Sequence, residues 1–177
     1  MKIFKPWQAI LFLFISSSLY AADDHVSINF YGVIGGASCD ISSDSENIPV
    51  YIGAFTTATF PSEGSVSPTK TFNITLQNCS SSTKTAEVTF TGTLATSSDT
   101  SLLALQDTAG TGNMASGVAV QLLDSTGNPL PINTLSGSYP ISNATTVLPF
   151  GLRYKSISTT VTPGEATSVM YFDIDYQ

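Results

Sequence analysis

The chain has 177 residues, of which 42% are hydrophobic and 11% charged, a length that suits one domain or two very small ones. Six Lys and Arg against thirteen Asp and Glu give a net charge of -7, which excludes a broad nucleic-acid surface because such a surface needs basic side chains against phosphate. Ten Phe and seven Tyr with so few charges are typical of a β-rich globular protein, not of a disordered or a helical one.

Residues 1–21 are predicted to be a secretory signal peptide. Two lysines give a basic start, and the apolar run from Ala9 to Ile15 is too short to span a bilayer. Small residues then precede an acidic stretch, so we expect cleavage after Ala21, with Ala22 as the alternative. No later segment is apolar enough to cross a membrane as a helix. The mature product is therefore expected to be exported and soluble.

The two cysteines, Cys39 and Cys79, have one possible pairing, and export permits a disulfide between them. By chain entropy, closing a loop of roughly 40 residues would contribute about 4 kcal/mol to stability. A metal pair or a catalytic thiol would need His or further Cys ligands, and the chain has a single histidine, His25, which is expected to be solvated. We expect no metal site and no cofactor.

From Val26 onward, short stretches of alternating apolar residues are separated by turn chemistry at intervals near ten residues. This rhythm predicts an antiparallel β-sandwich. After a strand at 26–34, the predicted strands in chain order are 72–76, 88–90, 118–122, 148–154 and 170–176, with a hairpin turn at 124–128. Helical periodicity is weak, and at most one helical turn is expected, within 100–106.

The two terminal strands are the informative ones. The last alternates through Met170, Phe172, Ile174 and Tyr176, and no hairpin partner follows it before Gln177. The first alternates over about nine residues, roughly 30 Å if extended, and Gly35-Gly36 then interrupts it. Its apolar row comprises Val26, Ile28, Phe30, Gly32 and Ile34. The ordinary interpretation is two sandwich strands, whereas the alternative is a first strand on a flexible tether that reaches another chain.

The motifs that would indicate catalysis or metal binding are weak. Two Ser-x-x-Lys matches, at 67–70 and 81–84, lie in Ser/Thr-rich turns without the helix or the Lys-Thr-Gly that penicillin-binding enzymes carry. Asp40, Asp44 and Glu46 are close in sequence, but their spacing misses the calcium-binding EF-hand loop. A solvated acidic loop is the preferred interpretation, and no enzyme is expected.

The mature chain resembles the pilin subunits of chaperone-usher fimbriae, related to the type 1 pilins. The resemblance rests on Phe30-Tyr31-Gly32 with Cys39 nine residues after the Phe, on Phe72-x-Ile74-x-Leu76-x-x-Cys79, on 88–92 and on 117–124. Its most specific part is C-terminal: Gly164, fourteenth from the end, and the penultimate Tyr176 with Phe172 and Ile174 in phase.

The resemblance implies an incomplete immunoglobulin-like β-sandwich that lacks its last strand and has a signal peptide at 1–21, a donor-strand extension at 22–37 and a pilin domain at 38–177. A periplasmic chaperone would fill the open groove first. At the outer-membrane usher, the extension of a neighbouring subunit would replace the chaperone's strand. The implied donor residues are Val26, Ile28, Phe30, Gly32 and Ile34. The implied chaperone-binding residues are Gly164, Met170, Phe172, Ile174, Tyr176 and Gln177.

The resemblance also implies that Cys39 and Cys79 join the first two strands of the body, and that the protein is a non-enzymatic subunit of an adhesive fimbria on the surface of a Gram-negative bacterium. Host receptors would be reached through the assembled fibre. The alternative is a secreted or fimbrial-tip β-sandwich that binds a host glycan or protein. A rod subunit and a minor or adaptor subunit are equally compatible with these residues.

Overall fold

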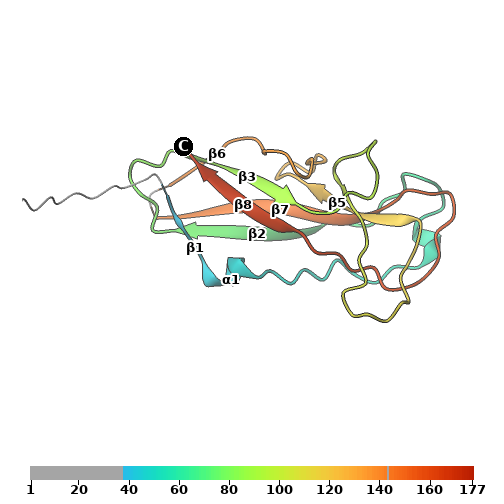
Figure 1. Cartoon of the computed structure of the whole chain (residues 1–177). Helices are drawn as coiled ribbons and strands as arrows, with labels where there is room; N and C mark the ends of the chain where they lie inside the picture. The colour runs from blue at the N-terminus through green and yellow to red at the C-terminus, as the bar shows by residue number, and fades with distance from the viewer. Residues whose placement is uncertain (1–37, 143) are drawn as a thin grey trace, which may run out of the picture. The chain divides into compact units, whose positions relative to one another are not determined.

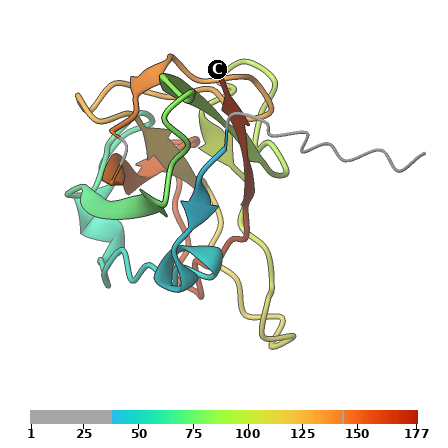
Figure 2. The same ribbon diagram turned by 90° about the vertical axis from the view of Figure 1, so that its left-hand side faces the viewer.

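Two antiparallel β-sheets pack face to face in the computed structural model, which describes residues 38–142 and 144–177 (Figures 1 and 2). The five-stranded sheet has the order β1-β2-β7-β5-β4, and the three-stranded sheet has the order β6-β3-β8. The strands are β1 (Asp40–Ile41), β2 (Lys70–Gln77), β3 (Thr85–Thr91), β4 (Leu102–Leu103), β5 (Val118–Leu123), β6 (Tyr139–Pro140), β7 (Thr145–Ser156) and β8 (Tyr171–Tyr176). The prediction of an all-β sandwich is confirmed.

Alternating side chains place the core between the two sheets. In the five-stranded sheet, Phe72 of β2 lies opposite Phe150 of β7. In the three-stranded sheet, Phe90 of β3 lies opposite Phe172 of β8. The rings of Phe90 and Phe150 meet edge to face across the core, with centroids 4.8 Å apart, an arrangement that aromatic quadrupoles favour. Residues two apart along each strand therefore share the buried face.

Strand β5 is buried on both of its faces. Its outward-facing Gln121 is fully buried, donates to Ser101 Oγ at 3.0 Å and accepts from Arg153 Nε at 2.9 Å. Asp99 accepts from both the backbone and the hydroxyl of Ser101, and it pairs with Lys155 Nζ at 2.8 Å. This network satisfies the polar groups that would otherwise be costly to bury beneath the surface of the sheet.

A disulfide joins Cys39 to Cys79 across 40 residues, with their Cα atoms 4.0 Å apart. Cys39 immediately precedes β1, and Cys79 lies two residues beyond the end of β2. The predicted bond between the first two body strands is therefore confirmed.

The connections differ from the sequence predictions in three places. A single helical turn, α1 (Ser43–Glu46), and a 3-10 turn, η1 (Thr57–Thr59), were not anticipated. No helix forms within 100–106, where at most one helical turn was expected, and Leu102 and Leu103 instead pair with β5 as β4. The hairpin turn at 124–128 is present, where Asp124 N donates to Asn128 O at 2.9 Å. No helix within the described ranges is long and apolar enough to span a bilayer.

Candidate functional site

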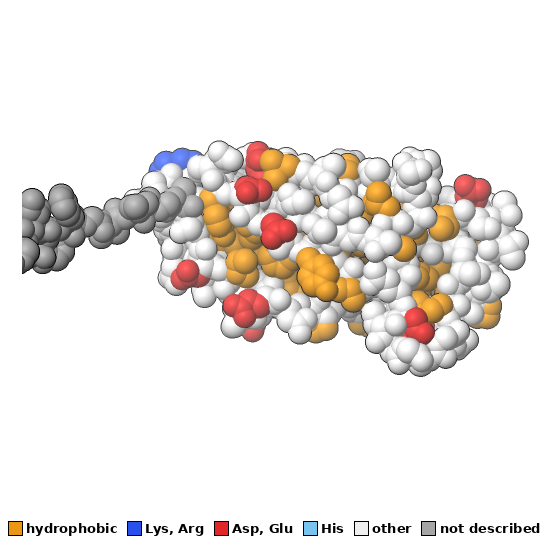
Figure 3. All heavy atoms as spheres, in the orientation of Figure 1, with side chains coloured by type: hydrophobic (Ala, Val, Ile, Leu, Met, Phe, Trp, Pro, Cys, Tyr) orange, Lys and Arg blue, Asp and Glu red, His pale blue; other side chains and the backbone are white. Residues whose placement is uncertain are grey.

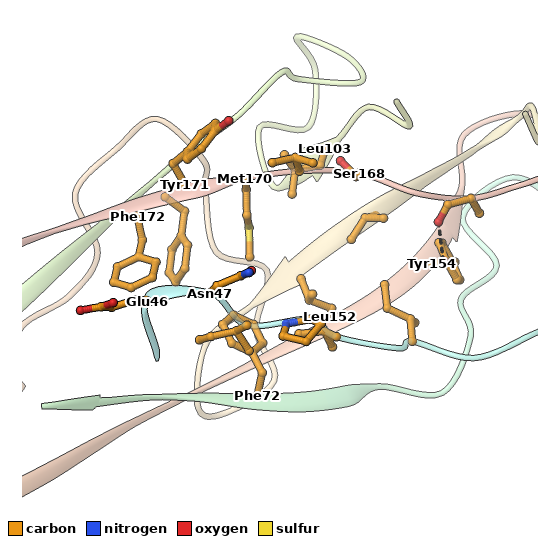
Figure 4. A pocket seen from close by; sticks show the side chains of 18 of the residues that line it. Glu46, Asn47, Phe72, Leu103, Leu152, Tyr154, Ser168, Met170, Tyr171 and Phe172 are labelled. Carbon is orange, nitrogen blue, oxygen red and sulfur yellow. Dashed lines mark hydrogen bonds between the residues drawn. The ribbon is translucent and has the colours of Figure 1, made fainter. Parts of the chain in front are cut away.

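An apolar groove of about 640 Å³ opens between the irregular segment 46–52 and the segment 166–172, which includes the start of β8 (Figure 4). Its floor is the sandwich core itself, contributed by strands of both sheets: Phe72, Phe90, Leu103, Val120, Leu152 and Tyr154. Among the described residues that line the groove, Glu46 alone carries a charge. The groove is therefore a place where the core meets solvent between the two sheets.

One wall of the groove is the extended segment that follows α1. Ile48, Val50 and Ile52 are half-buried and pack against the core, whereas Tyr51 between them is 75% exposed. This alternation has the period of a β-strand, although the segment belongs to no sheet. Our sequence predictions did not include it, although the alternating apolar residues from 48 to 52 are a signal that could have identified it.

The opposite wall is anchored by side-chain hydrogen bonds. Tyr154 reaches from the floor and donates through its hydroxyl to Ala166 O at 2.6 Å (Figure 4). Burial raises the pKa of the Tyr154 phenol, so the hydroxyl stays protonated and able to donate at neutral pH. Thr167 Oγ1 and Ser168 Oγ donate to Gln106 O and Ala104 O at 2.6 and 2.8 Å. These bonds keep the wall apart from segment 46–52.

Strand β8 forms the edge of its sheet on the groove side. It pairs with β3 from Tyr171 to Tyr176, and within the described chain these six residues make no other backbone hydrogen bond. The half-buried Phe172 and Ile174 face the core, while Tyr171, Asp173 and Asp175 face outward. An edge of this kind offers unpaired N–H and C=O groups to a further strand.

The end of β8 lies close to β1. Tyr176 donates through its hydroxyl to Cys39 O at 3.3 Å, and burial raises the pKa of this phenol. The carbonyl of Gln177 accepts from the backbone of Lys84 at 2.8 Å, so the last residue is held beside the start of β3. The groove is thus lined by the first half of β8, not by its end.

The residues assigned from the sequence fall into three groups. Met170, just before β8, and Phe172 line the groove, and Ile174 and Tyr176 lie on the same face of β8 as Phe172 without lining it. Gly164 lies outside the groove, against the backbone of Met114 and Ala115. The row from Val26 to Ile34 lies outside the described residues.

Within 38–142 and 144–177, no three His, Cys, Asp or Glu side chains come close enough to hold one ion. Asp40 accepts a hydrogen bond from Asn78 Nδ2 at 3.0 Å. The acidic loop considered as a calcium site thus has a structural contact at one of its carboxylates.

The class of protein that these features define is a β-sandwich whose core meets solvent beside an edge strand, and comparisons with known proteins identify the family. The family model described as "Fimbrial protein" matches residues 28–177. An uncharacterized fimbrial-like protein of Escherichia coli K12 is 34% identical over 97% of both chains. The type-1 fimbrial protein A chain of Escherichia coli is 35% identical, over 85% of this chain and 82% of that one.

Solved structures agree with the sequence relatives. The Burkholderia pseudomallei antigen and type I fimbria protein is 36% identical, with a TM-score of 0.58 over 78% of this chain and 88% of that one. The P pilus rod subunit, 21% identical, shares the fold with a TM-score of 0.66 over 78% and 99% of the two chains. This chain belongs to the fimbrial protein family, as a pilin of the chaperone-usher class. It is a structural subunit of a fimbria exported to the surface of a Gram-negative bacterium.

Proposed function

We propose that the groove beside β8 accepts a strand from another chain, first from a periplasmic chaperone and then, at the outer-membrane usher, from residues 26–34 of a neighbouring subunit. The observation that carries the proposal is the groove of about 640 Å³, whose floor is core and whose border is the unpaired edge of β8. An added strand would complete the backbone hydrogen bonds of that edge and cover the exposed core together. In this scheme the subunit is not an enzyme.

The composition of residues 26–34 suits the groove. Four large apolar side chains at alternate positions would be buried, and at about 1.5–3 kcal/mol each they would contribute on the order of 6–12 kcal/mol. A domain is typically stable by only about 5–15 kcal/mol, so the acceptor would depend on the added strand. The inserted row is Val26, Ile28, Phe30, Gly32 and Ile34.

Glycine at position 32 has a steric explanation within this row. A side chain at that position would approach the bulky floor or the backbone of the acceptor. We expect Gly32→Leu to weaken assembly while the subunit that carries it still folds and still accepts a strand. Fibre yield measures this effect, and a normal yield would contradict it.

The chaperone is proposed to pair with the same edge of β8 before a neighbouring subunit does. Phe172 and Met170 would contact its apolar side chains, and the terminal carboxylate of Gln177 would be held by basic residues of the chaperone. The proposed chaperone-binding set is Gly164, Met170, Phe172, Ile174, Tyr176 and Gln177.

Thermal melting of the mature chain trimmed of residues 22–36 tests the proposal, with and without a synthetic peptide spanning 24–35. We expect stabilisation by tens of degrees on peptide binding. Two altered peptides act as matched controls: Phe30→Ala removes an inserted side chain and should bind roughly 10- to 150-fold more weakly, whereas Asn29→Ala, at an outward position, should change affinity little.

The outcomes separate the competing functions. A trimmed chain that melts cooperatively at an ordinary temperature and ignores the peptide would indicate a complete domain and refute strand acceptance. An unstable trimmed chain that ignores its own peptide would instead indicate a minor subunit whose groove takes another protein's strand.

A further inference from the structure

The outer face of the three-stranded sheet carries a row of acidic side chains next to the edge of β8. Asp173 and Asp175 alternate with the core-facing residues of β8, and both are exposed. Glu87 of β3 lies directly opposite Asp175 in the strand register. Figure 3 shows several separate acidic side chains among apolar patches on the face of the molecule that it presents.

This arrangement costs stability within the subunit. Like charges directly opposite each other on neighbouring strands are destabilising, as Glu87 and Asp175 are here. The salt bridge within the described residues, between Lys155 and Asp99, does not involve either carboxylate. Lys84, which precedes β3, directs its ammonium to Ser81 O at 2.6 Å. The acidic row therefore calls for an explanation beyond the folded state of one subunit.

An unpaired edge exposes each subunit to a wrong partner, namely the same edge of a second subunit. Two β8 strands could pair antiparallel about a two-fold axis and continue the sheet from one subunit into the other. For their core-facing residues to stay on one face, outward residues must lie opposite outward residues. When the axis passes through Ile174, Asp173 of each strand faces Asp175 of the other, which gives two aspartate pairs. When it passes through Asp173 or through Asp175, that aspartate faces its own copy, which gives one pair.

The strand that the groove is proposed to accept lacks this conflict. Ser27, Asn29, Tyr31 and Val33 alternate with the inserted row of residues 26–34 and are all uncharged. Acidic residues occur in the extension only before this stretch, at Asp23 and Asp24. An inserted strand 26–34 would therefore place uncharged side chains beside Asp173 and Asp175. A second β8 would place aspartates there.

We propose that Asp173 and Asp175 form a charge barrier that prevents two open subunits from pairing through their β8 edges, while admitting the uncharged strand 26–34 of a neighbouring copy. The barrier rests on the proposed function, because it protects the same edge that accepts the strand. It acts while that edge is uncovered, and it is specific to a second copy of β8, since a neutral strand meets no like charge there.

Sedimentation velocity of the full mature chain at neutral pH and low salt tests the barrier. Pairing through β8 is isologous and stops at a dimer, whereas strand donation is heterologous and produces longer oligomers, so the two associations are distinguishable by size. The test variant is Asp173→Asn/Asp175→Asn. The matched control is Asp44→Asn/Glu63→Gln, which removes two exposed carboxylates elsewhere and changes the net charge equally.

We expect the test variant to dimerise with an association constant roughly 2- to 30-fold higher than that of wild type or the control, the factor that one or two opposed like-charge pairs produce. The difference should nearly vanish at about 1 M salt, where the screening length is about 3 Å. Equal dimerisation of the test and control variants at low salt would overturn the barrier, as would a difference that salt leaves unchanged.

A charge-reversal experiment gives an independent result. Asp173→Lys/Asp175→Lys should form heterodimers when mixed with wild type, because opposite charges then face each other, and neither protein should dimerise alone. Absence of the heterodimer would refute the pairing geometry. Binding of the 24–35 peptide to wild type is measured separately. If wild type does not bind this peptide, strand acceptance is refuted. If it binds the peptide but Asp173→Asn/Asp175→Asn dimerises no more than the control variant, only the barrier is refuted.

Discussion

Gly164 lies where the chain allows no side chain. A Cβ built at this residue would contact the backbone of Met114 and Ala115, including Met114 O at 2.6 Å. Glu165, the residue after the glycine, holds the two segments together through two hydrogen bonds: Ala115 N donates to Glu165 O at 2.8 Å, and Glu165 N donates to Asn113 O at 2.7 Å. We therefore expect Gly164→Ala to push these segments apart and destabilise the domain.

The magnitude follows from two contributions. Inserting a methyl group into a filled space costs about 1–3 kcal/mol, and each weakened backbone hydrogen bond costs about 1 kcal/mol more. A total near 3 kcal/mol would lower the midpoint of urea unfolding by roughly 1.5 M at an m-value of about 2 kcal/mol/M. Far-UV circular dichroism of the mature chain, with and without saturating 24–35 peptide, measures this midpoint.

Gly137→Ala is the matched control, because no heavy atom lies within 4 Å of a Cβ built there. It should change stability by less than about 0.5 kcal/mol. If Gly164→Ala were equally neutral, the close approach of residues 114–115 would be refuted as the reason for glycine. A variant that unfolds normally yet loses affinity for the chaperone would assign Gly164 to chaperone contact instead.

Three further changes have defined outcomes. Replacing Cys39 and Cys79 by serine should cost about 4 kcal/mol of unfolding free energy, because the bond closes a 40-residue loop. Urea unfolding of the variant and of the oxidised wild type measures the difference, and a loss below about 1 kcal/mol would contradict the expectation. Burial raises the pKa of Asp99, but hydrogen bonds from Lys155 and Ser101 outweigh it and hold this pKa below its ordinary value. The stability contributed by Asp99 is therefore present above about pH 4 and lost as pH falls through the lowered pKa. The unfolding free energy of Asp99→Asn should consequently depend less on pH below about 4 than that of wild type. The same pH dependence in both proteins would refute this pairing. Gln121→Leu leaves Arg153 Nε without its acceptor and removes the amide donor to Ser101 Oγ, which still donates to Asp99. It should cost about 1–3 kcal/mol in thermal or urea unfolding, whereas a neutral result would show that water replaces the amide.

The sequence predicted the long strands well because their signal is local. Phe72, Ile74 and Leu76 alternate on a sheet with one buried face, and the same period places Phe172 and Ile174 toward the core. Leu102 and Leu103 were missed because a two-residue strand has no period, and its conformation is set by its pairing with β5.

The candidate site was predicted only in part. Met170 and Phe172 were assigned from the C-terminal strand, and both line the groove. The wall at 48–52 and the floor contributed by Leu103, Val120 and Leu152 were not assigned. Floor residues are ordinary core side chains in the sequence, and only the three-dimensional separation of two chain segments shows that solvent reaches them.

The disulfide has a mechanical consequence whenever the chain is pulled from its N-terminal side. Without the bond, a pull transmitted along the chain from residues before 38 would load β1, a two-residue strand paired with β2. Cys39 diverts that load through a covalent bond to Cys79, just beyond β2, whose eight residues all pair with β7. The force is then carried in shear by the longest ladder in the sheet, so stretching a fibre would leave each subunit's own sandwich intact.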